Sequence, residues 1–154
     1  MKNNNFDIQI ESLIVFVAED ILRSAGMQSE RQYLHHGTVT CYEHSVRVAY
    51  MSAYIALRLC LPVNMRSLLR GALLHDYFLY DWHETDKSHR FHGFIHAKRA
   101  LEKASLDFEL SEMEQDIISK HMFPLNPKPP KYLESVVVLV ADKICAISEL
   151  LYGR

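Results

Sequence analysis

The sequence predicts an all-α fold, a bundle of about six helices in a single domain over residues 1–154. In most segments the apolar residues recur every three or four positions, which is the period of an amphipathic helix. Proline, glycine and good N-capping residues separate these segments. Only Ser135–Val140 is rich enough in valine to resemble a strand. Helical spacing continues beyond it to Leu151, so we assign this run to a buried helix.

Helix boundaries follow from local signals. Gly26 is suited to end the first helix, and Pro62 follows the second. Asn64 is a good N-cap for the third, and Ser111-Glu112-Met113-Glu114 has the pattern of a capping box for the fifth. The expected helices span residues 6–25, 41–61, 65–78, 94–105, 111–122 and 132–151.

Two polar segments are expected to be loops. Residues 28–40 contain Gly37 together with His35 and His36. Residues 79–93 form a longer insert that lacks apolar periodicity and is rich in aromatic residues and histidine. A loop of that length in a compact domain is unusual unless it has a function.

Composition excludes several classes of protein. The net charge of -2 gives no basic excess for binding a nucleic-acid polymer or an anionic membrane. Neither a signal peptide nor an apolar run of about 18 residues is visible, so no membrane span is expected. Cys41, Cys60 and Cys145 are odd in number and far apart, which predicts free thiols in a reducing cytoplasm. The sequence does not predict the oligomeric state.

The chain has nine histidines, and their positions suggest a metal site. Six His and Asp residues fall on apolar faces or at helix ends, and apart from one adjacent pair each lies on a different predicted helix. A bundle builds a metal site in its core in this way. A buried Asp142 in an apolar run would need a partner, which a divalent cation supplies. Each residue alone could instead be exposed, hydrogen-bonded or a helix cap, and the combination favours the metal site. These residues are His44, His75, Asp76, His96, His121 and Asp142.

The chain resembles the HD superfamily of metal-dependent phosphohydrolases over about residues 36–150. The segments that carry the resemblance are His44–Ala49, Leu73–Asp76, His96, His121 and Ala141–Asp142.

The resemblance implies that His44, His75, Asp76 and Asp142 hold one metal ion. Asp76 would bridge to a second ion held by His96 and His121. His92, four residues before His96, is the substitute candidate for that ligand. Fe or Mn is favoured, and Co, Ni and Zn also suit imidazole and carboxylate ligands.

For activity, the resemblance implies hydrolysis of a nucleotide or another small phosphoester or phosphodiester by a metal-activated hydroxide, with Asp76 and His75 as the catalytic pair. Leu79 stands where the HD-GYP branch has a lysine, and a Gly-Tyr-Pro signature is absent, so the sequence does not place the chain in that branch. Side chains in the insert and beside the ligands are candidates to bind the substrate, although most such charges are only solvated. The candidates are Lys87, Arg90, Lys98, Lys120, Lys143, Trp82, Phe91, His36, His83 and His89.

Two other functions remain open at this point. One is a non-catalytic HD module that binds metal or a nucleotide, and the other, a minor option, is an HD-fold di-iron oxygenase. A helical scaffold that has lost its site is disfavoured, because buried polar residues are costly to keep without a function.

Overall fold

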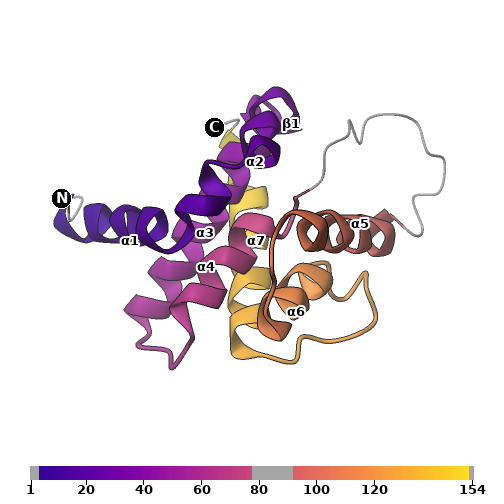
Figure 1. The fold of residues 1–154 in the computed structure, drawn as a ribbon. Helices are drawn as coiled ribbons and strands as arrows, with labels where there is room; N and C mark the ends of the chain where they lie inside the picture. Colours follow the sequence, from indigo (N-terminus) through magenta and orange to yellow (C-terminus); the bar gives the residue numbers. More distant parts are fainter. Residues whose placement is uncertain (1–3, 78–91, 153–154) are drawn as a thin grey trace.

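A computed structural model describes residues 4–77 and 92–152 of the chain (Figure 1). Within these residues the fold is all-α, as predicted, with seven α-helices, one 3-10 turn and a two-stranded hairpin. The helices are α1 (Asn4–Leu22), α2 (Ala25–Ser29), α3 (Cys41–Arg58), α4 (Met65–Leu74), α5 (His92–Asp107), α6 (Glu112–Lys120) and α7 (Leu133–Tyr152). The 3-10 turn is η1 (Glu30–Gln32), and the antiparallel strands are β1 (Leu34–His36) and β2 (Val39–Thr40).

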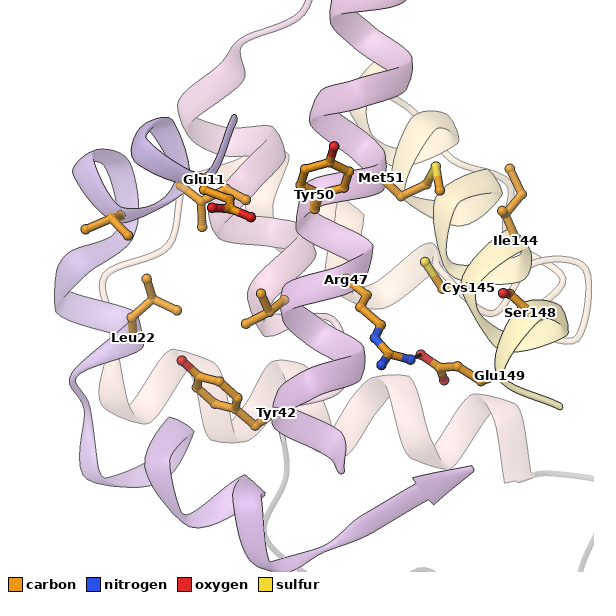
Figure 2. A pocket seen from close by; sticks show the side chains of 13 residues that line it. Glu11, Leu22, Tyr42, Arg47, Tyr50, Met51, Ile144, Cys145, Ser148 and Glu149 are labelled. Carbon is orange, nitrogen blue, oxygen red and sulfur yellow. Dashed lines mark hydrogen bonds and ion pairs between the residues drawn. The ribbon is translucent and has the colours of Figure 1, made fainter. Parts of the chain in front are cut away.

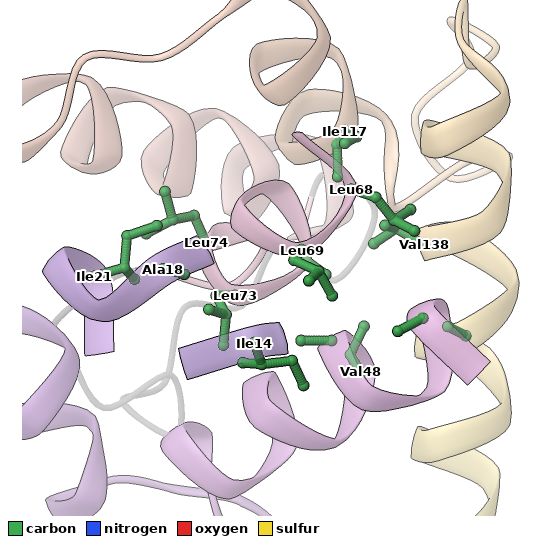
Figure 3. Close-up of a cluster of buried hydrophobic side chains, with 14 of the residues drawn as sticks. Ile14, Ala18, Ile21, Val48, Leu68, Leu69, Leu73, Leu74, Ile117 and Val138 are labelled. Carbon is green, nitrogen blue, oxygen red and sulfur yellow. The ribbon is translucent and has the colours of Figure 1, made fainter. Parts of the chain in front are cut away.

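Helix α4 lies at the centre of the bundle, where it contacts α1, α3, α6 and α7 (Figure 1). Every residue from Ser67 to Leu74 is buried. Leu68 and Leu69 pack among side chains of the neighbouring helices, and Leu73 does the same near Ile14 of α1 (Figure 3). The apolar run that precedes the His75-Asp76 pair is therefore the core of the fold, and it places that pair in the interior.

The capping signals read from the sequence are present. The Asn64 side chain accepts a hydrogen bond from the Ser67 backbone N–H and starts α4. Ser111 and Glu114 form a reciprocal capping box at α6. Thr40 and Glu43 form a second box, which fixes the start of α3 one turn before His44. Caps of this kind each stabilise a helix by about 1 kcal/mol.

The region around residues 22–40 differs from the expectation. Gly26 does not end the first helix, because α1 stops at Leu22 and Ser24 caps a new short helix, accepting from the Met27 backbone N–H. A Cβ at Gly26 would clash with the hydroxyl of Tyr77, so glycine is required there for packing. The expected loop over residues 28–40 contains η1 and the β1–β2 hairpin.

Two smaller boundaries also differ from the expectation. Helix α4 ends at Leu74 rather than near Phe78, and α5 begins at His92, inside the expected insert.

No helix in the described ranges is both long and apolar enough to cross a membrane. All three cysteines are free thiols, with Cys41 and Cys145 buried and Cys60 exposed.

Candidate metal centre

Helix ends deliver two of the predicted histidines to the interior. His75 is the C-cap of α4 and His121 is the C-cap of α6, and both side chains are fully or almost fully buried. His75 Nδ1–H donates to the Ala72 carbonyl at 2.7 Å, and His121 Nδ1–H donates to the Ile118 carbonyl at 2.7 Å. Each ring therefore directs Nε2 into the core, and neither Nε2 has a hydrogen-bond partner among the described residues.

Asp76 lies between two groups of imidazoles. Its Oδ1 is 2.7 Å from His96 Nε2 and 3.2 Å from His121 Nε2. Its Oδ2 is 3.1 Å from His35 Nε2 and 3.5 Å from His75 Nε2. The two oxygens of one carboxylate thus face different pairs of histidines.

Asp142, from the middle of α7, closes one side of the cluster. Its Oδ1 is 3.2 Å from His44 Nε2 and 3.7 Å from His75 Nε2. His44 Nδ1–H donates to Glu149 Oε2 at 2.9 Å, which leaves Nε2 as the atom directed at Asp142. All six residues predicted as ligands are therefore brought together in the interior.

These contacts require positive charge between the rings and the carboxylates. In neutral His44, His75 and His121 the proton is on Nδ1, so the Nε2 lone pair faces a carboxylate oxygen. Two lone pairs at such distances repel unless a proton or a cation lies between them. Imidazole and carboxylate donors directed at one another in a buried site suit a divalent transition metal ion.

In the metal-free protein, protons supply only part of that charge. Burial disfavours the charged carboxylate of Asp76, but the neighbouring histidines, His75 first, hold its pKa well below the usual range. Burial opposes protonation of His75 too, yet the charge of Asp76 raises its pKa to about 9. His121 differs, because burial dominates and lowers its pKa. At neutral pH His121 is therefore a neutral imidazole, with the Nε2 lone pair toward Asp76.

In the part of the chain that the structure describes, three groups of side chains have donor atoms close enough to share an ion, all within 4.8 Å of one another. Two groups contain only predicted ligands and have Asp76 in common. The third contains two residues that the sequence analysis did not assign to the site. The groups are His44 with His75 and Asp76, Asp76 with His96 and His121, and His35 with His44 and Glu149.

The sequence analysis missed three residues near the centre. His35 was noted only as a loop residue, and neither Glu149 nor Glu30 was considered. Glu149 lies seven residues after Asp142, two helical turns along the same face of α7, so helical spacing could have identified it. Glu30 is fully buried in η1, and within residues 4–77 and 92–152 neither carboxylate oxygen has a hydrogen-bond partner. Burial and then the charge of Asp76 raise the Glu30 pKa well above the usual range.

The predicted substrate-binding residues are only partly described. Lys120 is half-buried beside His121 at the end of α6. Lys143 Nζ lies 3.7 Å from Asp142 Oδ2 with 45% of its side chain exposed. Lys98 pairs with Glu102 on the surface of α5. The side chains of His36 and His92, and all of Trp82, His83, Lys87, His89, Arg90 and Phe91, lie outside the described residues.

A separate cavity of about 670 Å³ lies between α1, α3 and α7 (Figure 2). Its lining is mainly apolar, and Arg47 and Glu149 border it with an ion pair at 3.4 Å. None of the six predicted ligands lines it. Its apolar walls contrast with the histidine cluster, where imidazole and carboxylate donors gather.

Comparison with protein families agrees with this geometry. The HD domain family matches residues 41–147, more than half of the chain. The chain belongs to the HD domain family. HD domains are typically metal-dependent phosphohydrolases. No curated protein and no solved structure matches the chain.

The HD match includes the six predicted ligands, from His44 to Asp142. It begins after His35 and ends before Glu149. The histidine cluster of this HD domain therefore contains two residues from outside the matched region.

Proposed function

We propose that this HD domain is a metal-dependent phosphohydrolase that acts on a nucleotide or another small phosphoester and uses two divalent transition metal ions. The observation that carries the proposal is the position of Asp76. One of its oxygens faces His96 and His121, while the other is on the side of His75. A carboxylate in that position is suited to bridge two ions.

The chain's own residues would divide between the two ions. His44, His75 and Asp142 would hold the first ion, with Asp76 Oδ2 completing the set. His96 and His121 would hold the second with Asp76 Oδ1. Ions bound in this way lower the pKa of a water molecule and offset negative charge on phosphate oxygens. The hydrogen bonds of His75 and His121 to helix carbonyls fix their rings, so that Nε2 stays directed inward.

The substrate would meet positive charge beside the ligands. Lys143 extends from Asp142 toward solvent, and Lys120 precedes His121 in the chain. We therefore propose that they bind phosphate oxygens. Lys87, Arg90, Trp82 and His36 remain candidates on the sequence alone.

The test combines metal content with turnover. Elemental analysis of protein purified without a chelator should give about two transition-metal ions per chain. A panel of phosphomonoesters, nucleotides and cyclic dinucleotides should then reveal hydrolysis. Asp76→Ala should lose both the metals and the activity. Arg23→Ala is the matched surface control, because Arg23 is exposed on the surface and pairs with exposed Glu19 at 3.0 Å, and it should retain both.

Other results would contradict the proposal in different ways. Two bound ions with no turnover on the whole panel would favour the non-catalytic binding module. About one ion per chain would leave His96 and His121 as pocket residues. Two ions retained by Asp76→Ala would refute its role as the bridge.

A further inference from the structure

A pair of stacked histidines lies at the edge of the candidate metal centre. The rings of His35, from β1, and His44, from α3, are 3.9 Å apart between centroids and nearly parallel, with an interplanar angle of 18°. His44 is fully buried, and the His35 side chain is 11% exposed. The hairpin thus brings an additional imidazole against a predicted ligand.

Both rings present the same edge to Glu149. The Oε2 atom of this buried glutamate is 2.9 Å from His44 Nδ1 and 3.8 Å from His35 Nδ1. The opposite edges face the carboxylates of the centre, with His44 Nε2 directed at Asp142 and His35 Nε2 at Asp76 Oδ2. Stacking and a shared carboxylate therefore give the two rings the same orientation.

We propose that Glu149 is a positioning residue that directs Nε2 of both His35 and His44 toward the first metal ion, and that His35 is an additional ligand there. This inference rests on the proposed metal-dependent function. In metal sites, a carboxylate commonly accepts the second N–H of a ligating histidine, which fixes the ring and strengthens it as a donor. Here one carboxylate would serve two rings. Since both residues lie outside the HD match, this is a feature of the chain in addition to the matched HD region.

The ion pair with Arg47 does not account for the position of Glu149. Arg47 Nη1 contacts the other oxygen, Oε1, at 3.4 Å, and 42% of the Arg47 side chain is exposed. Exposed ion pairs contribute at most about 1 kcal/mol, so this contact alone gives little reason to bury a carboxylate. The shorter contact is to His44, on the side of the metal centre.

The two oxygens of Glu149 provide a matched pair of variants. Glu149→Gln keeps the side-chain volume but removes the charge that serves the imidazoles. Arg47→Gln removes the ion pair on the far oxygen and leaves the contact of Glu149 with the imidazoles. Each protein is stripped of metal and titrated with Co²⁺, following absorption in the visible range. Thermal unfolding of the stripped proteins confirms that each variant is folded.

We expect Glu149→Gln to weaken Co²⁺ binding by about 10- to 100-fold, the usual effect of losing such a carboxylate. Arg47→Gln should stay within about twofold of wild type. His35→Ala should still bind two Co²⁺ ions, but the spectrum of one should change, because that ion loses a nitrogen donor.

Wild-type Co²⁺ affinity in Glu149→Gln, or an equal loss in Arg47→Gln, would overturn the role of Glu149. An unchanged spectrum in His35→Ala would overturn the role of His35 as a ligand. These results are independent of turnover. A protein that binds Co²⁺ as expected but hydrolyses no phosphoester would refute the proposed function and retain this inference. If the wild-type protein hydrolyses a phosphoester but the variants bind Co²⁺ like wild type, the proposed function stands and this inference is refuted.

Discussion

Replacing Asp76 by Asn should destabilise the metal-free protein at acidic pH and much less at alkaline pH. Asp76 is the main source of the charge that holds a proton on buried His75. Against the effect of burial, the charge of Asp76, then Asp142 and the Ala72 carbonyl, raise the His75 pKa from 6.5 to about 9. Such a shift corresponds to roughly 3 kcal/mol of preferential interaction with the protonated ring.

The pH dependence follows from the direction of that shift. A group whose pKa is higher in the folded state contributes stability that is fully present below its unfolded pKa, about 6.5, and is lost as the pH rises through about 9. Asp76→Asn should therefore lower the free energy of unfolding at pH 6, by up to about 3 kcal/mol, because Asp142 and the Ala72 carbonyl still favour the protonated ring. At pH 10 His75 is neutral in both proteins, and the difference should be much smaller.

Urea unfolding followed by circular dichroism, with a chelator present, measures this difference at both pH values. Asp20→Asn is the matched control. Asp20 pairs with Arg70 at 2.7 Å, and a guanidinium stays charged over the whole range. Its effect should be similar at pH 6 and pH 10. If Asp76→Asn lowered the free energy of unfolding by as much at pH 10 as at pH 6, the coupling of Asp76 to His75 would be refuted.

Three further predictions follow from the core and the centre. Glu30→Gln should raise the melting temperature of the metal-free protein by about 2–4 °C at pH 8 and by little at pH 4. The raised Glu30 pKa means that the charged form of Glu30 destabilises the folded protein. A larger gain in melting temperature at pH 4 than at pH 8 would contradict this. Gly71→Ala should lower the free energy of unfolding in urea by about 1–3 kcal/mol, because the new Cβ would lie 2.5 Å from Ile117 Cδ1. Combining Gly71→Ala with Ile117→Val should recover part of this loss. If none is recovered, the contact with Ile117 is not its cause. His121→Ala should retain one metal ion per chain by elemental analysis, since it faces only Oδ1 of Asp76; two retained ions would remove His121 as a ligand.

The fold was predictable where the signals are local. Asn64 and the Ser111 box are read directly from the sequence, because a cap depends on residues three positions away. Gly26 shows the limit of that reasoning. A glycine after an apolar helix usually marks its end, but here glycine is required by the Tyr77 hydroxyl, which comes from another part of the chain.

The same limit explains which site residues were found. His75 and Asp142 are conspicuous because they interrupt apolar runs. His35 follows a polar segment and has no such contrast, so its role is indicated only by the fold, in which it stacks on His44 and faces Asp76. Glu149 had a usable signal in its spacing from Asp142, but exposed glutamates at that spacing are common. Its burial and its contacts with imidazoles become visible only when α7 is packed against α3.

The hydrogen bond between His44 and Glu149 joins residues 105 positions apart, and the contact between His35 and Asp76 spans 41. Contacts of such separation close long loops, and a fold that depends on them forms more slowly than one built from local contacts. During synthesis, a ribosome must release the end of α7 before Glu149 can reach the two rings. Until then the nascent chain carries histidines and aspartates that can bind ions only in loose, incomplete sets. Capture of a metal in the complete site would thus report that α7 has docked against α3 and β1, and it would stabilise only chains in which these elements are in place.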